Sequence, residues 1–175
     1  GFQPQLPAKN TFISDSFKLE KTTKLQAANN QQQPEKIYAN KGIESWQGVS
    51  DRFNQPKAAT YISLQNPQIT QKLNQRLLAQ LAAKWLNNQL NAPAYPARLA
   101  GLDYSIYAHS RGLTLHLNGF NQQQPRLAKL MLEELLAGKV EEASFERLKN
   151  QLVQQLANQQ VSQPVQQLVN QLHTQ

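Results

Sequence analysis

From Pro34 onward, the pattern of hydrophobic and polar residues first has the period of β-strands. The segments EKIYAN (35–40) and IESWQGV (43–49) flank Lys41-Gly42, a dipeptide suited to a hairpin turn. Residues 57–65, KAATYISLQ, form a third predicted strand, which ends at Asn66-Pro67. The chain after Pro34 therefore opens with three predicted strands in succession.

The pattern changes to a helical period at about Ile69. Apolar residues recur every three to four positions as far as Leu90, and they are Leu73, Leu77, Leu78, Leu81, Ala82, Trp85 and Leu86. This spacing predicts one long amphipathic helix over 69–90, with its apolar stripe toward a core. A proline-containing segment and a short helical turn that stops at Gly101 follow it.

Residues 104–119, YSIYAHSRGLTLHLNG, predict a hairpin of alternating polarity. We place Arg111-Gly112 at its tip and Ser110 opposite Leu113. The core-facing positions are then Ile106, Ala108, Leu115 and Leu117. The opposite face carries Tyr107, His109, Thr114, His116 and Asn118.

Two further helices are predicted after the hairpin. The first begins at Pro125 and ends at Gly138, with an apolar face of Leu127, Leu130, Met131 and Leu135. The second takes Ser144 as its N-cap and carries Phe145, Leu148, Leu152 and Leu156. Residues 162–164 are expected to break or kink it, and the last apolar stripe stops abruptly at the chain end, as in a C-terminally truncated domain.

The order of these elements predicts an α+β fold, in which helices cover one face of an antiparallel sheet as a two-layer sandwich. Residues 1–33 lack sustained periodicity and are rich in Gln, Asn and Pro, so we expect a linker or extended arm. Residues 34–175 are expected to form a single domain. No apolar run is long enough to span a membrane, and residues 1–10 lack the pattern of a signal peptide.

Composition excludes some classes of chemistry. The absence of cysteine excludes disulfides, thiolate metal sites and thiol catalysis. The net charge of +7 would permit acidic partners, but the basic residues are scattered rather than gathered in a block. Charge alone therefore argues against a nucleic-acid role and favours a solvated surface.

Histidines are the first candidates for chemistry. In the register given above, His109 pairs with Thr114, and His116 is its diagonal neighbour at roughly 6–8 Å, a separation at which one zinc ion could be shared. No Asp, Glu or third His occupies the other outward positions of the two strands. We therefore prefer the interpretation that His109 and His116 belong to a polar sheet face without a metal-binding role. His173 is taken as a lone surface histidine.

The remaining candidates are weaker. Glu133-Glu134 and Glu141-Glu142 are adjacent residues, which point about 100° apart on a helix and so do not make a catalytic pair. No nucleophile elbow, catalytic triad or phosphate-binding glycine loop is present. Rings that could stack on RNA bases are better explained by packing in the sheet, and they are Tyr38, Trp46, Phe53, Tyr61, Tyr104 and Tyr107. The residues alone therefore give no catalytic, cofactor-binding or metal site.

Four segments in one order carry a family resemblance. They are LPAKNTFI (6–13), the stretch from Trp46 through DRFNQPKA (46–58), LAGLDYSIYAHSRGLTLHLNGFNQQQPRLAKLMLEEL (99–135) and FERLKNQLVQQLANQQVSQP (145–164). Together they resemble the insulysin/pitrilysin branch of the M16 zinc metallopeptidases, collinearly from about Leu6 to the C-terminus. The matching region is the linker between the two halves of the enzyme and most of its third domain.

The resemblance implies a fold like that of mitochondrial processing peptidase and a non-catalytic role in a peptide-degrading chamber. The domain would form chamber wall and contact other domains of the same polypeptide, while peptides would be substrates of the parent enzyme. Zinc would be bound by the first domain through H-x-x-E-H, a motif that this sequence lacks. Bacterial members of the branch suggest a periplasmic location, and exposed interdomain surface would permit self-association.

Two other interpretations stay open at this point. The net charge of +7 leaves room for a free-standing binding module for peptides or anionic polymers. The parent could also be an inactive peptidase relative that retains the fold without its zinc motif. Of the three, the non-catalytic domain of a zinc metallopeptidase is preferred, because the four collinear segments carry the resemblance.

Overall fold

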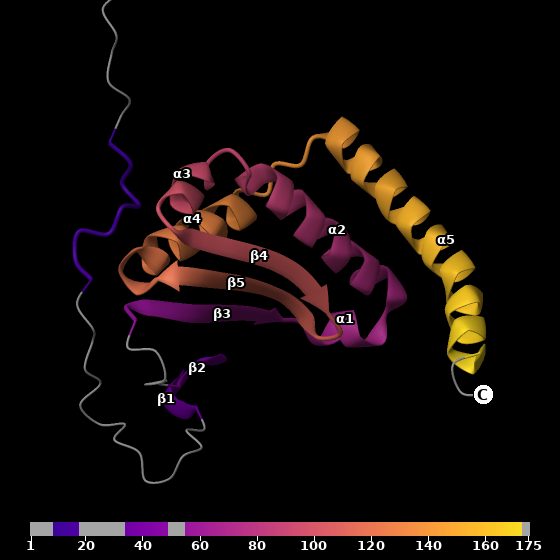
Figure 1. Cartoon of the computed structure of the whole chain (residues 1–175), viewed down its shortest axis with the longest axis horizontal. Helices are drawn as coiled ribbons and strands as arrows, with labels where there is room; N and C mark the ends of the chain where they lie inside the picture. Colours follow the sequence, from indigo (N-terminus) through magenta and orange to yellow (C-terminus); the bar gives the residue numbers. More distant parts are fainter. Residues whose placement is uncertain (1–8, 18–33, 49–54, 173–175) are drawn as a thin grey trace, which may run out of the picture.

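The computed structural model describes residues 9–17, 34–48 and 55–172, with side chains described up to Asn158. Its central layer is an antiparallel sheet of three strands in the order β3-β5-β4 (Figure 1). These strands are β3 (Lys57–Gln65), β4 (Leu102–His109) and β5 (Gly112–Phe120). The third strand predicted from the sequence is thus confirmed to the residue.

Helices cover one face of this sheet. The main covering helices are α2 (Leu73–Leu90) and α4 (Gln124–Ala137), and between them and the sheet lies a core of fully buried side chains. Six of these large side chains have less than 2% exposure: Leu86, Leu90, Leu115, Leu117, Leu127 and Met131. The core-facing set predicted for the hairpin is confirmed, and so is the α+β class with helices on one face.

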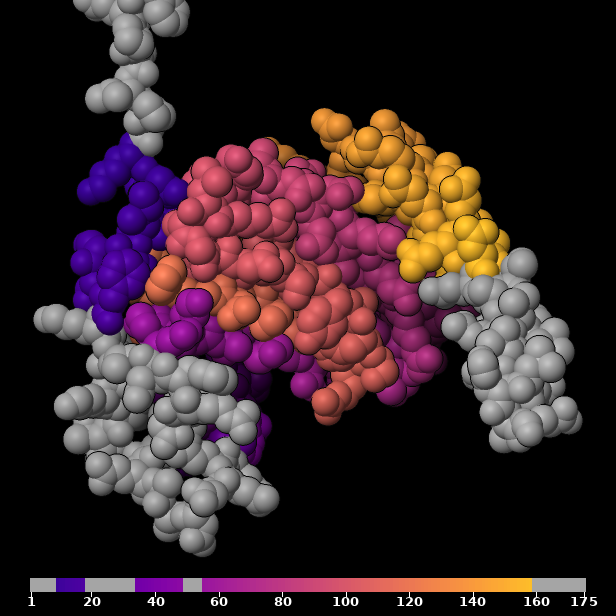
Figure 2. Space-filling model, in the orientation of Figure 1, coloured from indigo at the N-terminus to yellow at the C-terminus, as the bar shows by residue number. Residues whose placement is uncertain are grey.

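Shorter elements connect the layers. Helices α1 (Pro67–Gln71) and α3 (Tyr95–Leu99) flank α2, and a 3₁₀ turn over Asn121–Gln123 leads from β5 into α4. The N-terminal half of the last helix, α5 (Glu142–Leu172), packs beside α2 (Figures 1 and 2). Its side chains Leu148 and Leu152 are buried in the core cluster, which fixes the N-terminal half of α5 to the domain.

The first two strands form a separate hairpin. Strands β1 (Glu35–Asn40) and β2 (Ile43–Gln47) pair only with each other among the described residues. Lys41 and Gly42 both have positive φ, +46° and +80°, as a type I′ turn requires. The predicted turn is therefore confirmed, and the five predicted strands form two sheets rather than one.

The helix predicted over 69–90 is interrupted. Lys72 is extended, with φ −121° and ψ 124°, and separates α1 from α2. The predicted stripe is also wrong at its start, because Leu73 and Leu78 are 69% and 49% exposed. Two small residues, Ala79 and Ala83, are buried instead. Where α2 packs closely against its neighbours, the size of a side chain decides its burial as much as its apolarity does.

Two expectations about the last helix are wrong as well. It begins at Glu142, so Ser144 is an internal residue rather than the N-cap, and the Phe145 amide donates to the Glu141 carbonyl at 2.9 Å. An acidic residue in the first turn suits the helix dipole, which gives this earlier start a physical reason. The helix also runs unbroken through residues 162–164, so the predicted break is wrong, while the alternative of a kink at Pro164 stays a prediction. Gly138, with φ +56°, ends α4 as predicted.

The described part of the N-terminal segment, residues 9–17, lies against the domain. Phe12 is 7% exposed and belongs to the core cluster, and the guanidinium of Arg126 lies 5.6 Å from its ring centroid. The Asn10 side-chain amide donates to the Pro96 carbonyl at 2.7 Å. The rest of the predicted arm, 1–8 and 18–33, lies outside the described residues, so its division from the domain at 33/34 stays a prediction.

Candidate functional site

The face of the sheet opposite the helices carries both histidines of the hairpin. Side chains there come from alternate positions of three strands, since the residues between them point to the core. The largest are Tyr61 of β3, His116 of β5, and Tyr107 and His109 of β4. This polar and aromatic surface is the first place to look for chemistry.

The pairing of β4 with β5 differs from the predicted register by two residues. His109 lies opposite Gly112 and Ser105 opposite His116, so Ser110 and Arg111 form the turn. Four residues of β5 thus separate the two positions, or about 13 Å at 3.3 Å per residue. The prediction that His109 and His116 are diagonal neighbours is wrong, and at this separation they cannot share one zinc ion.

The reason for the shift lies at Gly112. A Cβ atom on this residue would overlap the carbonyl oxygen of Leu64 on β3. The glycine is therefore needed inside the strand, where two backbones approach closely, and not at the turn. Sequence spacing alone cannot distinguish these two uses of a glycine.

Each histidine has its own polar neighbours. His109 Nδ1 accepts from the Arg111 amide at 3.2 Å, which leaves Nε2 to carry the proton toward the Ser63 hydroxyl at 3.5 Å. The His116 ring stacks on Tyr61, with centroids 4.3 Å apart and planes 9° apart, and its Nδ1 lies 3.3 Å from the Ser105 hydroxyl. Among the described residues no carboxylate contacts either imidazole, and a carboxylate is the partner that often orients a general base or a metal ligand.

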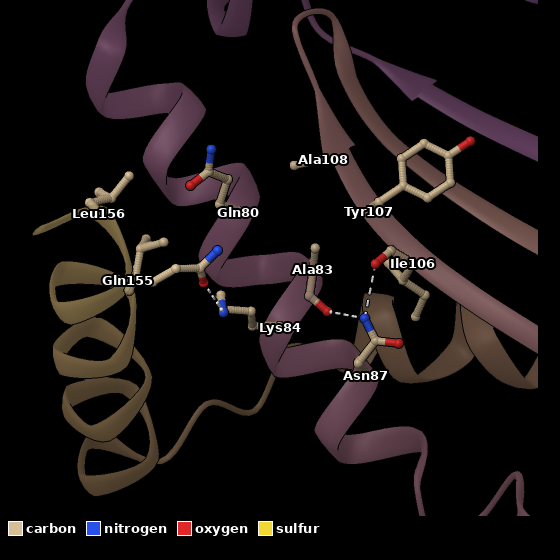
Figure 3. Close-up of a pocket in the computed structure, with 10 residues that line it drawn as sticks. Gln80, Ala83, Lys84, Asn87, Ile106, Tyr107, Ala108, Gln155 and Leu156 are labelled. Atoms are coloured by element: carbon tan, nitrogen blue, oxygen red, sulfur yellow. Dashed lines mark hydrogen bonds between the residues drawn. The ribbon is translucent and has the colours of Figure 1, made fainter. Parts of the chain in front are cut away.

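A small cavity of about 310 Å³ lies between α2, β4 and α5 (Figure 3). Its polar groups bond to one another: the Lys84 ammonium donates to Gln155 at 2.9 Å, and the Asn87 amide donates to the carbonyls of Ala83 and Ile106, both at 2.9 Å. Among the described residues that line it, Lys84 is the only ionisable side chain apart from the phenol of Tyr107. The cavity therefore offers packing between layers and no acid–base pair.

Tyr104 is a buried phenol beside a charged pair. Burial raises its pKa, while the Arg98 guanidinium, 4.7 Å from the ring centroid, lowers the pKa and Asp103 raises it by a smaller amount. Among the described residues its hydroxyl has no hydrogen-bond partner. A phenol whose proton is held more tightly is a poor nucleophile or base near neutral pH.

Carboxylates do not gather anywhere in the described part of the chain. Within those ranges, no group of three or more His, Cys, Asp or Glu side chains is close enough to hold a metal ion. Glu133 forms an exposed ion pair with Lys129 at 3.7 Å. Of the other candidates, Phe53 and His173 lie outside the described residues. The residues present thus do not fit a zinc ion, and the predicted absence of catalytic residues stays a prediction.

One important polar residue was missed. Gln124 is 3% exposed at the start of α4 and accepts from the Thr60 hydroxyl at 2.6 Å. It also donates to the carbonyls of Ala58 at 2.6 Å and Gly119 at 3.0 Å, so it joins β3, β5 and α4. Its place in the run Gln122–Gln124 hid it, because three identical neighbours give no sign of which one is buried.

The sequence of the chain is similar to that of a known protein family and of several of its members. Residues 3–175 match the family described as the middle or third domain of peptidase M16. The chain is 30% identical to human insulin-degrading enzyme over 145 residues, which are 83% of the chain and 14% of that enzyme. It is 30% identical to nardilysin of Pongo abelii over 147 residues, 84% of the chain and 12% of nardilysin.

The fold also matches a solved structure. A crystal structure of pitrilysin superposes with a TM-score of 0.73 at 24% identity, over 87% of this chain and 16% of that one. The fold is therefore that of a domain of an M16 peptidase. With the family match over nearly its whole length, the chain belongs to the peptidase M16 family as its middle or third domain. It spans only about one seventh of the length of these relatives.

Proposed function

We propose that this chain is a non-catalytic structural domain of a zinc-dependent metalloendopeptidase that degrades peptides inside an enclosed chamber. The match to the middle domain of the family over residues 3–175 carries the proposal. It is supported by the lack of a metal-binding group among the described residues and by the separation of His109 and His116. Zinc and the reacting groups then belong to another domain of the same polypeptide.

The role of this domain is to form chamber wall and to contact neighbouring domains. Several large apolar side chains are exposed in the described part of the chain, as expected where other domains pack. Leu73 and Leu136 are the most exposed of them, at 69% and 84%. No helix in the described ranges combines the length and hydropathy that crossing a bilayer requires. By family resemblance alone, we also propose a periplasmic location, which cell fractionation with an antibody to the chain would test.

The proposal is tested by assaying the purified chain for zinc and for cleavage of a fluorogenic peptide. We expect less than 0.1 zinc per chain by mass spectrometry, on the order expected where no three-ligand site exists, and no turnover above buffer. One bound zinc per chain together with turnover lost in His109→Ala or His116→Ala would overturn it.

The contact role needs a longer polypeptide that carries this chain together with its neighbouring domains. There, Leu73→Ser and Leu136→Ser should lower both peptidase activity and melting temperature. In the chain alone the same substitutions should change little, because both side chains are already exposed. Lys129→Ser on the surface of α4 is the matched control, and equal effects from all three substitutions would contradict a contact role.

A further inference from the structure

Residues 9–17 are attached to the domain at several points along their length, and we call this segment the anchor. Its contacts reach α3, the 3₁₀ turn over Asn121–Gln123, β5 and α4 (Figure 2 shows the anchor, in indigo, against one end of the domain). Within it, Phe12 and Ser14 are only 7% and 6% exposed, as side chains of a core are. The family match starts at residue 3 and so includes the anchor together with the domain.

Asn10 orients the most important side chain of the anchor. Its side-chain nitrogen donates to the Pro96 carbonyl at 2.7 Å, and its side-chain oxygen accepts from the Phe12 amide at 3.0 Å. This is an Asx turn, in which one side chain fixes the backbone two residues further on. The ring of Phe12 thereby enters the core cluster, with the Arg126 guanidinium 5.6 Å from its centroid. Withdrawing a buried ring into water is unfavourable, so Phe12 holds the segment in place.

A second attachment follows at Gln122. Its side-chain oxygen accepts from the amides of Asp15 and Ser16 at 3.1 and 3.2 Å, and its side-chain nitrogen donates to the Asp15 carboxylate. The ring of Phe17 then packs edge-on against Phe120, with centroids 5.1 Å apart. The anchor is thus bonded at both ends and buried in the middle, so the loss of one contact does not release it.

The place of the anchor in the sequence decides what the segments beside it connect. Residues 1–8 precede it, and residues 18–33 join it to Pro34 and β1. Pro34 lines a cavity together with residues 58–63 of β3, so the chain is again attached to this domain where that second segment ends. Residues 18–33 therefore add no length to a connection between this domain and whatever precedes it in the polypeptide.

We propose that residues 9–17 anchor the incoming chain, so that the segment crossing from the preceding half of the peptidase ends at Lys9 and residues 18–33 form a loop within this domain. The proposal rests on the proposed function, which supplies the preceding half. An enclosed chamber has to open to admit a peptide, and the chain that crosses between its halves limits how far they separate. Release of the anchor would add residues 9–33 to that crossing, at about 3.3–3.6 Å per extended residue. The anchor is thus a restraint on opening.

A cleavable form of the 175-residue chain tests whether the anchor holds. A site for a sequence-specific protease is inserted between Ala28 and Asn29, and the anisotropy of a dye on Gly1 follows the cut chain on dilution. The two fragments should stay associated, and Phe12→Ala or Gln122→Ala should weaken the association by about tenfold or more. Gln122 is exposed, so its substitution leaves the core intact.

Ile13→Ala is the matched control in the same cut chain, because Ile13 belongs to the anchor but is 58% exposed. It should leave the association unchanged. Fragments that separate as readily without substitution as with Phe12→Ala would overturn the proposal, and so would equal weakening by Ile13→Ala. This experiment needs neither zinc nor peptidase activity, so its outcome is independent of the proposed function.

Two insertions of one length test the consequence in a longer polypeptide that carries the preceding half. About ten Gly and Ser residues after Gln5 lengthen the crossing segment, and the same insertion after Ala28 lengthens the loop. With one dye on each half, energy transfer between the dyes should fall for the first insertion and stay unchanged for the second. Equal effects of the two insertions would contradict the proposal. Absence of peptidase activity from a polypeptide in which the insertions differ as expected would count against the proposed function alone.

Discussion

At the scale of single residues, the buried side chain of Gln124 makes three hydrogen bonds that link α4 to the sheet. Its side chain satisfies the Thr60 hydroxyl and two strand carbonyls inside a region with almost no solvent access. A buried polar group left without a partner costs more than the hydrogen bond itself contributed. The glutamine thus fixes the position of α4 against the sheet, in a place where an apolar residue of the same size would leave the Thr60 hydroxyl without its partner and would remove one hydrogen bond from each of the two strand carbonyls.

We predict that Gln124→Ala lowers the free energy of unfolding by about 2–4 kcal/mol, through the lost hydrogen bonds and the space left behind. Urea unfolding followed by circular dichroism measures this change. The neighbouring substitution Gln123→Ala is the control and should stay within about 0.5 kcal/mol of the parent chain, since Gln123 makes no capping hydrogen bond. Equal losses from the two variants would show that Gln124 has no special role.

Tyr104 gives the chain a pH dependence at the alkaline end. Burial raises the pKa of its hydroxyl in the folded state, so the folded chain keeps this proton more tightly than the unfolded chain. Stability is therefore fully present below the unfolded pKa of about 10 and is lost as the pH rises through the folded pKa. We predict that Tyr104→Phe reduces the fall in urea midpoint between pH 9 and pH 11. Tyr107→Phe, at an exposed ring, is the control, and an unchanged profile in Tyr104→Phe would refute the assignment.

At the scale of elements, features that depend on local sequence were predicted, and features that depend on contacts between distant segments were not. The bounds of β3 and the turn at Lys41-Gly42 follow from local chemistry, namely β-branched and aromatic alternation and a dipeptide that accepts positive φ. The pairing of β4 with β5 does not, because it depends on Gly112 meeting the backbone of β3. The break at Lys72 was not predicted either; across it, the Arg76 guanidinium donates to the carbonyls of Ile69 and Thr70 at 3.2 and 2.6 Å.

The difference between local and long-range contacts also explains which features of the candidate site were predicted from the sequence. The predicted register placed His109 and His116 correctly on one face of the hairpin, since a shift of two residues preserves the faces of both strands. The predicted distance between His109 and His116 was too short, because the observed register of β4 and β5 differs by two residues and gives each histidine another cross-strand partner. Gln124 was missed, because its burial depends on where three separate elements meet.

We predict that Gly112→Ala destabilises the chain by more than about 2 kcal/mol, because its methyl group would overlap the Leu64 carbonyl and push β5 from β3. Gly42→Ala is the comparison: it has open space around it and a φ of +80°, so its cost should be about 1 kcal/mol from backbone strain. Thermal melts of both variants measure the stability that each substitution costs. A smaller loss for Gly112→Ala than for Gly42→Ala would contradict the role given to the close approach of the two strands.

At the scale of the whole molecule, charge separates a domain of a larger enzyme from an independent binding module. The net charge is +7, yet several positive groups are engaged locally: Lys36 with Glu44, Lys149 with Glu146, and Arg98 over the Tyr104 ring. Binding to anionic polymers needs several free cations on one face, since each contacted phosphate adds to the affinity and to its dependence on salt. Scattered, partly paired cations predict weak attraction that salt removes.

We therefore predict that the chain shows no saturable binding to a fluorescent 20-base DNA or to heparin near physiological ionic strength, with any affinity weaker than about 100 µM. Fluorescence anisotropy measures it across a salt series, and a basic protein of known affinity serves as the positive control. Weak binding at low salt that vanishes at physiological salt fits a solvated surface, because the Debye length there is only about 8 Å and isolated cations are screened. Tight binding that persists at physiological salt, and that weakens when Lys57 and Arg126 are replaced by Gln, would instead identify a built anion-binding face and favour an independent module over a wall domain.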